Sequence, residues 1–493
     1  MILDQVLLLG SVVLLSSILA ARLGARLGLP SLLIFLVLGM VVGELGLNLD
    51  DPELAHALGF AALVLILGEG GFTTRWSELR TALPAAVLLA TLGVGVSVVA
   101  VAAFAHWVLR LDPATSVLLG AITSPTDSAA VFSVLRKVPL PARPRAILEA
   151  ESGFNDAPIV LLVATATSWV MSGRSDGGVP VMIGLIVLQL SAGVAVGYGV
   201  GWIGVRVMRG TALPASGLYP LGAMGWAVLA YGVGTWLHVS GFAAVYVAAM
   251  VLGNGQLPHR NATRSFAEGI GWIAQIGLFV MLGMLADPRR ITLGSVAVGL
   301  VAGTFLTLVA RPLSVIACLV WFKLPRRETA FISWAGLRGA VPIIMATVPL
   351  AAGLPQAPEL FDMVLAFVIV FTLVQAPTLP WVARALGVST GEELIDIEVE
   401  VAPLDKIQAD MMQVRVPDGS RLHGVTIREL RLPKNTMVSL IIREDEPFTP
   451  GPDHVIRNGD DLLIVTSSAD RQRVEERLKQ VSRGGRLARW QER

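Results

Sequence analysis

The sequence predicts an all-α polytopic membrane protein of about 13 membrane-spanning helices, followed by a small α+β domain outside the bilayer. The chain has 493 residues, of which 54% are apolar and only 15% are charged, and its mean hydropathy is +0.69. This composition is too apolar for a soluble protein of this size. Apolar stretches close to the length that spans a bilayer, about 20 residues, recur as far as Leu386, and charged residues become dense only after it.

Thirteen apolar segments support this count, although the second, third and ninth are short. The N-terminus lacks the basic region that precedes a signal-peptide core, so we expect the first segment to be a membrane-spanning helix. The segments are 3–21, 30–44, 58–72, 83–109, 115–134, 146–171, 179–207, 218–237, 241–254, 266–286, 293–322, 329–351 and 360–386.

Basic residues are distributed unevenly between alternate loops, with sixteen on one side and four on the other. Because loops rich in Lys and Arg stay in the cytoplasm, the N-terminus is predicted to lie outside and the C-terminus inside. The richer loops hold Arg22, Arg26, Arg75, Arg80, Arg136, Lys137, Arg143, Arg145, Arg206, Arg209, Arg260, Arg264, Lys323, Arg326, Arg327 and Arg384. The poorer loops hold Arg110, Arg174, Arg289 and Arg290.

Composition divides the chain into a membrane domain at 1–387, an acidic linker at 388–400, a small α+β domain at 401–484 and a basic tail at 485–493. The alternation of Ile and Val with acidic residues from 395 to 401 also predicts a strand. Further strands are expected at 411–416, 437–442 and 462–466, with helices at 425–430 and 469–480. The single cysteine, Cys318, excludes an intrachain disulfide.

An ionisable residue, Asp156, lies in the middle of the sixth apolar segment. A charge at such a position costs about 2.5 kcal/mol or more, so it is retained for a reason. Glu149, Ser152 and Asp156 share one helix face, and Glu151 and Asn155 form the adjacent face. A polar stripe of this density faces protein or water rather than lipid. The alternative is structural, with Asp156 pairing a buried cation that holds the bundle together.

Two other segments are interrupted at mid-span by Pro and Gly. Residues 123–128 contain Pro125, which removes a backbone donor, and residues 336–342 surround an arginine. An interruption in each half of the chain is typical of inverted-repeat secondary transporters, so we expect two broken helices that cross. A simple proline kink, with hydroxyls bonded back to the helix, is the alternative for the first. In a true break, an alkali cation would find freed carbonyls and the hydroxyls of Thr123, Ser124 and Thr126.

Charged residues accompany both interruptions. Asp127 and Arg338 are expected to counter the end charges of the half-helices. Arg338 needs an anionic partner, for which Glu151 is the candidate, and Arg311 is expected to neutralise helix ends. Glu69, in the third segment, either completes the site or is structural.

These motifs resemble those of monovalent cation:proton antiporters of the NhaP type. The matching pieces are 120–127 (Gly-Ala-Ile-Thr-Ser-Pro-Thr-Asp), 151–156 (Glu-Ser-Gly-Phe-Asn-Asp) and 336–342 (Gly-Leu-Arg-Gly-Ala-Val-Pro). The resemblance covers the chain to about Leu386. It departs at Ser128, where many relatives have Pro, and this loosens the match to sodium-specific members. The C-terminal part resembles the TrkA-C half of RCK modules, which gate potassium transporters and channels, so together the two parts indicate the potassium/proton branch.

The resemblance implies a homodimer in which a mobile core domain moves the site across the membrane against an interface domain. It implies that Asp156 carries both the cation and the proton, and that Glu151 pairs with Arg338. The further residues near the cation would be Ser152, Thr126 and Glu69.

The predicted function is electroneutral exchange of K⁺, or Na⁺, for H⁺ across a bacterial inner membrane by competition at Asp156. Asn155 stands where electrogenic relatives have a second acid. Sodium/proton exchange, a ligand-gated cation channel and a non-transporting membrane sensor are the alternatives. No catalytic triad, metal cluster or phosphate loop occurs in the sequence, so neither an enzyme nor a cofactor is expected. The expected partners are the bilayer and a second copy, not nucleic acid, and a small-molecule ligand such as a nucleotide stays open for the C-terminal domain.

Overall fold

The computed structural model describes residues 3–27, 30–45, 49, 51–127, 131, 140–172, 178–211, 213–255, 257–389, 399–404, 409–417, 420–443, 446–467 and 470–484. The chain divides into two compact units, Met1–Thr390 and Gly391–Arg493, and each is described by itself.

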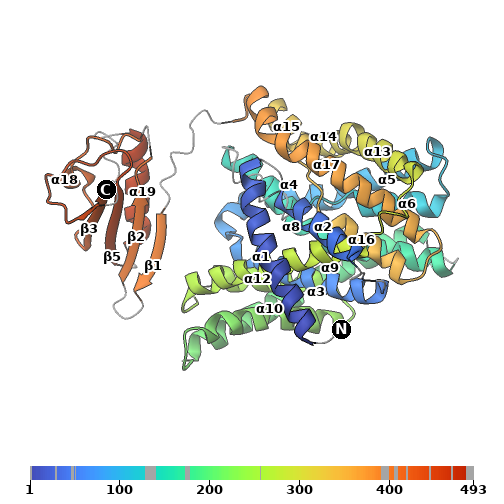
Figure 1. Cartoon of the computed structure of the whole chain (residues 1–493), viewed down its shortest axis with the longest axis horizontal. Helices are drawn as coiled ribbons and strands as arrows, with labels where there is room; N and C mark the ends of the chain where they lie inside the picture. The colour runs from blue at the N-terminus through green and yellow to red at the C-terminus, as the bar shows by residue number, and fades with distance from the viewer. Residues whose placement is uncertain are drawn as a thin grey trace. The chain divides into compact units, whose positions relative to one another are not determined.

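The first unit is helical, and each of the thirteen predicted apolar segments contains a helix or a run of consecutive helices (Figure 1). The elements are α1 (Leu3–Leu27), α2 (Ser31–Glu44), α3 (Pro52–Thr73), α4 (Trp76–Leu88), η1 (Leu89–Gly93), α5 (Val94–Trp107), α6 (Pro113–Thr123), α8 (Ala142–Ser172), α9 (Gly178–Gly210), α10 (Leu218–Trp236), α11 (Gly241–Asn254), α12 (Arg260–Leu285), α13 (Leu293–Phe305), η2 (Leu306–Ala310), α14 (Arg311–Leu319), η3 (Val320–Phe322), α15 (Arg326–Trp334), α16 (Ala340–Ala351) and α17 (Ala357–Ala385).

Many of these helices have the length and composition of membrane spans. Within the described residues, seven helical runs are long and apolar enough to cross a bilayer, and α2, α6, α11 and α16 are shorter apolar helices. The runs that begin at Leu79 and Leu293 each join two helices through a π-helical turn, η1 or η2. The chain is therefore a multi-pass membrane protein, as the sequence predicted.

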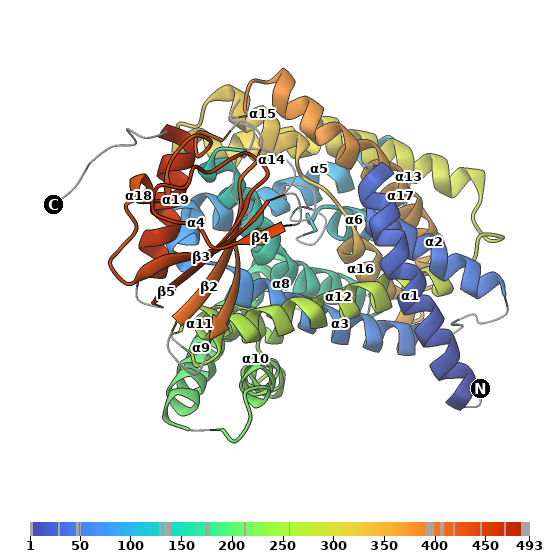
Figure 2. The same ribbon diagram turned by 60° about the vertical axis from the view of Figure 1, so that its left-hand side comes forward.

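The helices pack into two groups. One group contains α1, α2, α3, α9, α10, α11 and α12, and the other contains α4, α5, α6, α8 and α13 to α17. In both views, α3, α10 and α12 lie below α13, α14 and α17 (Figures 1 and 2). Glycine allows close approach within the first group, because a Cβ at Gly39 of α2 would overlap the backbone of Val280 in α12. The groups meet where α16 packs on α3 and where α8 packs on α9 and α11.

The second unit is a five-stranded antiparallel sheet with two helices, which confirms the predicted α+β class. Its strands are β1 (Val399–Leu404), β2 (Ala409–Arg415), β3 (Thr436–Arg443), β4 (Glu446–Phe448) and β5 (Asp461–Ser467), in the spatial order β1-β2-β5-β3-β4. Its helices are α18 (Ile427–Leu430) and α19 (Arg471–Gly484). Alternate residues of β5, such as Leu462 and Ile464, share a core with Val474 and Leu478 of α19.

Two features of this unit do not match in full what the sequence led us to expect. Residues 390–398 and the basic tail at 485–493 lie outside the described part, so of the strand expected at 395–401 only 399–401 is described, within β1. The short β4, which pairs with the end of β3, was not predicted. A strand of three residues is too short to show a period of two.

Candidate functional site

The site is centred on Asp156, near the middle of the 31-residue helix α8. The side chain is buried, and neither carboxylate oxygen has a hydrogen-bond partner among the described residues. The amide oxygen of Asn155, one residue earlier and fully buried, is unpartnered in the same sense. Buried polar oxygens are normally hydrogen-bonded, so these three oxygens on one turn of helix make this turn the candidate site.

A threonine from the first interruption joins this turn of α8. Helix α6 ends at Thr123, two residues before Pro125, and the chain continues without helical structure to Asp127. The hydroxyl of Thr126 accepts a hydrogen bond from Nδ2 of Asn155 at 2.8 Å and lies 3.0 Å from Oγ of Ser152. Thr126, Ser152 and Asn155 therefore form one buried polar cluster beside Asp156.

Two hydroxyls that the sequence assigned to the cation are used elsewhere. Thr123 donates to the carbonyl of Leu119 at 2.7 Å, and Ser124 donates to the carbonyl of Gly120 at 2.6 Å. Both are back-bonded to α6, as in the proline-kink alternative. Their O–H groups are thus used within their own helical turn, and a part for their oxygens in binding a cation stays a prediction.

The second interruption separates α15 from α16 and contacts the first. The amide of Asp127 donates to the carbonyl of Leu337 at 2.9 Å, and Oδ2 of Asp127 accepts from the amide of Ala340 at 2.8 Å. The carboxylate thus lies at the N-terminus of α16, where the helix dipole is positive. A Cβ at Gly339 would overlap Asp127 Oδ2, so a larger residue here would displace the carboxylate from the N-terminus of α16.

Glu151 pairs with Arg311 and not with Arg338, which corrects the pairing expected from the sequence. The guanidinium of Arg311 donates to both carboxylate oxygens, at 2.5 and 2.8 Å, and both side chains are buried. Arg311 is the first residue of α14, directly after the π-turn η2. It reaches Glu151 past Gly336, where a Cβ would lie 2.8 Å from Arg311 Nε.

Arg338 is fully buried and has a different set of contacts. Its Nη1 donates to the carbonyl of Gly336 at 2.8 Å, while Nε and Nη2 have no hydrogen-bond partner among the described residues. Its carbonyl accepts from the hydroxyl of Thr372 in α17 at 2.6 Å. Arg338 is therefore held in the crossing by its backbone and one donor, with guanidinium N–H groups left over.

Three further residues complete the description. Glu69 of α3 is half-buried and packs against Gly271 of α12, so its place near a cation stays a prediction. Glu149 forms an ion pair with Arg145, one turn earlier in α8, at 3.8 Å. Tyr246 of α11, which the sequence analysis missed, stacks edge-on against Phe154 of α8 with ring centroids 5.4 Å apart. Nothing in the sequence pointed to it, because its place opposite Gly153 is set by the packing of α11 on α8.

Comparison with known proteins shows the family to which this chain belongs. The profile described as "Sodium/hydrogen exchanger, transmembrane" matches residues 11–385, and that of the TrkA-C domain matches residues 411–479. The chain belongs to the sodium/hydrogen exchanger family. It is a monovalent cation:proton antiporter, and the family is one of transporters rather than enzymes. A TrkA-C domain follows the membrane domain, as the sequence predicted, and membership of an antiporter family disfavours the channel and sensor alternatives.

Relatives of the exchanger extend along most of its length. It is 32% identical over 465 residues to the K⁺/H⁺ antiporter NhaP2 of Shewanella oneidensis, covering 93% of this chain and 80% of the relative. It is 35% identical over 469 residues to the K⁺/H⁺ antiporter NhaP of Alkalimonas amylolytica, with the same coverage. The solved sodium/proton antiporter MjNhaP1 of Methanocaldococcus jannaschii at pH 8 shares the fold, with a TM-score of 0.66, 22% identity and coverage of 78% of this chain and 99% of that one.

Proposed function

We propose that this antiporter exchanges K⁺ for H⁺, one for one, and that the two compete for Asp156. The observation that carries the proposal is the buried carboxylate of Asp156, with both oxygens unpartnered. An empty buried carboxylate is costly, and binding either a proton or a monovalent cation removes its charge. Relatives named K⁺/H⁺ antiporters, similar over 93% of the chain, support potassium as the cation.

The neighbouring oxygens supply the groups that a dehydrated alkali cation needs. The amide oxygen of Asn155 is available beside the two oxygens of Asp156, and the hydroxyls of Thr126 and Ser152 lie within the same polar cluster. Asn155 is also neutral, so α8 offers one titratable carrier at this turn. Either loaded form is uncharged there and can move with the second helix group, while the empty anion stays in place. Glu69 is retained in the proposal as a residue near the cation.

The orientation of the chain in the membrane is inferred from the basic loops. The excess of arginine and lysine on alternate loops supports an N-terminus outside and a C-terminal domain in the cytoplasm, in the inner membrane of a bacterium. The first helix group would form the interface of a homodimer, and the second group, which contains α6, α8 and α16, would carry the site across. The TrkA-C domain would regulate the rate in response to a small ligand.

Sodium/proton exchange is the second candidate. A relative named Na⁺/H⁺ antiporter NhaH, from Halobacillus dabanensis, is 28% identical over 308 residues, which is 59% of this chain. The membrane unit is thus similar to exchangers named for either cation. Cavity size and ligand number decide between the two ions, and a cation series is the direct test.

The test is proton release from acid-loaded proteoliposomes on addition of K⁺, Na⁺ or Li⁺, with the full-length chain. We expect K⁺ to drive release and Asp156→Asn to abolish it at every pH. The matched control is Asp51→Asn, which replaces the N-cap of α3 with another good cap and should exchange normally. Exchange that persists in Asp156→Asn would refute the carrier assignment, and a response to Na⁺ alone would replace potassium with sodium.

Stoichiometry and regulation need separate measurements. One-for-one exchange moves no net charge, so a potential-sensitive dye should stay silent during K⁺-driven proton release, and a potential that builds up would contradict it. Removal of the chain after Leu386 should change the rate of exchange without changing cation preference. An unchanged rate would remove the regulatory role of the TrkA-C domain.

The polar cluster gives a second, finer test. Thr126→Val conserves volume but leaves Nδ2 of Asn155 without its acceptor, so we expect a KM for the cation at least about tenfold higher. Thr304→Val is the matched control, because Thr304 is exposed on α13 and bonds back to its own helix. Equal KM values for the two variants would remove Thr126 from the cation site.

A further inference from the structure

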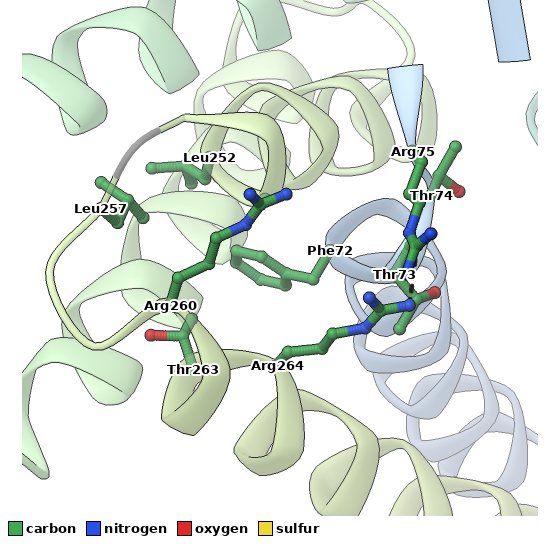
Figure 3. Close-up of a pocket in the computed structure, with 10 residues that line it drawn as sticks. Phe72, Thr73, Thr74, Arg75, Leu252, Leu257, Arg260, Thr263 and Arg264 are labelled. Atoms are coloured by element: carbon green, nitrogen blue, oxygen red, sulfur yellow. Dashed lines mark hydrogen bonds between the residues drawn. The ribbon is translucent and has the colours of Figure 1, made fainter. Parts of the chain in front are cut away.

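A second cluster of charged side chains lies away from Asp156, where α3 ends and α12 begins. Arg75, Arg260 and Arg264 line one pocket together with Phe72 and Thr73. Figure 3 shows Arg260 and Arg264, on successive turns of α12, on either side of the Phe72 ring, and Arg75 reaching the pocket from the connection between α3 and α4. We propose that this pocket binds the phosphate group of an anionic ligand.

The frame of the pocket is fixed before any ligand arrives. Asn254, at the end of α11, donates to the carbonyl of Thr74 and accepts from the amide of Trp76, both at 2.9 Å. A Cβ at Gly253 would lie 2.7 Å from the carbonyl oxygen of Phe72, so α11 and α3 are in close backbone contact there. The ends of three helices are thus locked around the three arginines, and a ligand needs little reorganisation of the backbone to bind.

The side chains have the chemistry of a phosphate site. Arg264 is oriented by the carbonyl of Thr73, at 3.2 Å from Nη2, and by Glu268, at 3.6 Å from Nε. Arg260 is exposed and has no ion-pair or hydrogen-bond partner in the described part of the chain. Guanidinium groups bind phosphate oxygens in pairs, and an anion between three of them relieves their mutual repulsion. The first turn of the 26-residue helix α12, which has no side-chain cap, adds positive potential.

The volume of the pocket and its level in the membrane indicate what kind of ligand it binds. The cavity volume is about 20 Å³, which is room for a small polar group such as one or two phosphate oxygens. Trp76 is 48% exposed beside the pocket, and tryptophan gathers at the level of lipid headgroups. On the proposed topology this level is the cytoplasmic leaflet, whose anionic lipids bind basic pockets between membrane helices. The phosphate can therefore come from a lipid headgroup or from solution.

The position of the pocket gives the bound anion a consequence. Arg260 and Arg264 belong to α12, in the first helix group, whereas Arg75 precedes α4, the first helix of the second group. An anion held between them ties the start of α12 to the connection between α3 and α4, where the chain passes from the first group to the second. Its occupancy would oppose relative movement of the groups there.

The test measures binding, so it does not depend on exchange. The full-length protein in neutral detergent is titrated with phosphatidylglycerol, phosphatidylcholine or inorganic phosphate, and the midpoint of thermal unfolding is followed. We expect phosphatidylglycerol to raise the midpoint of the wild type, and Arg75→Gln/Arg260→Gln to weaken its apparent affinity at least about tenfold. The matched control Arg80→Gln, an exposed residue of α4 outside the pocket, should respond like the wild type.

The three probes distinguish a lipid headgroup from free phosphate as the source of the bound group, and they also define the results that overturn the proposal. A response to phosphatidylglycerol but not to inorganic phosphate supports a lipid headgroup, and a response to both supports free phosphate as a ligand. An equal response to phosphatidylcholine overturns the proposal, as does a double variant that binds phosphatidylglycerol as tightly as the Arg80→Gln control. No response of the wild type to any of the three probes also overturns it.

Discussion

Glu151→Gln is the perturbation that tests the charge arrangement at the helix crossing most directly. In the wild type, Glu151 accepts two hydrogen bonds from Arg311, and the two side chains are only 1% and 3% exposed. Removing one partner of a buried ion pair costs about 3–5 kcal/mol, because the other charge stays buried without compensation. Arg338 is also fully buried nearby. Glu151→Gln therefore leaves two buried guanidinium groups, and we expect a loss at the upper end of this range.

The reverse substitution should cost less. Arg311→Gln leaves a single carboxylate, and Arg338 has two N–H groups, Nε and Nη2, without partners among the described residues. If Glu151 turns to them, a charge-assisted hydrogen bond is recovered, and the expected loss falls to about 2 kcal/mol. The order of the two variants is thus a prediction in its own right.

Equilibrium unfolding of the full-length protein in mixed micelles measures both losses. Glu44→Gln is the matched control, because its pair with Arg289 is exposed, at 42% and 81%, and should contribute less than about 1 kcal/mol. The reasoning is refuted if Glu151→Gln lies within about 1 kcal/mol of the wild type, or if Arg311→Gln is the more damaging of the two.

Two further predictions concern the crossing and the cytoplasmic unit. Gly339→Ala places a Cβ on Asp127 Oδ2, so the rate of exchange should fall at least about tenfold. The matched control is Gly277→Ala, where the added Cβ faces open space and exchange should be normal. Equal rates for the two variants in proteoliposomes would contradict this prediction. In the sheet, burial raises the pKa of Asp460, but hydrogen bonds and charge from Arg443 outweigh it, so the pKa lies below its usual value. The stabilisation is present above the unfolded pKa of about 4 and is lost as pH falls through the lower folded value. Arg443→Gln should therefore reduce amide-exchange protection of β5 at pH 7 by about 2 kcal/mol, and undiminished protection would show that the pair is not stabilising.

The helical frame could be predicted from the sequence because a bilayer sets the length of each apolar run. Every predicted segment contains a helix, and the errors are at the ends, as where α3 begins at Pro52 rather than 58. The N-cap Asp51 and the following proline mark that start, but a search for apolar residues passes over them. Strand β4 was not predicted, because its three residues are too few to show the alternation that marks a strand.

The candidate site could be predicted in part. The interruptions at Pro125 and Gly339 are local features, and the sequence located both. Partners across helices are not local. The sequence paired Glu151 with Arg338 and gave Arg311 to helix ends, whereas the observed pairing with Arg311 depends on the π-turn before α14 and on the space left by Gly336. No spacing within one segment contains that information, so the pairing with Arg338 was wrong.

The corrected pairing leads to a count of charge at the crossing. Three carboxylates are buried there, on Asp127, Glu151 and Asp156, together with two guanidinium groups, on Arg311 and Arg338. Asp127 is bonded to the N-terminus of α16 and Glu151 to Arg311, so the unpartnered carboxylate is that of Asp156. With all five ionised, the cluster carries one net negative charge, and one proton or one K⁺ neutralises it. A second ion would leave an uncompensated positive charge in a low-dielectric interior, which is the physical argument for one-for-one exchange.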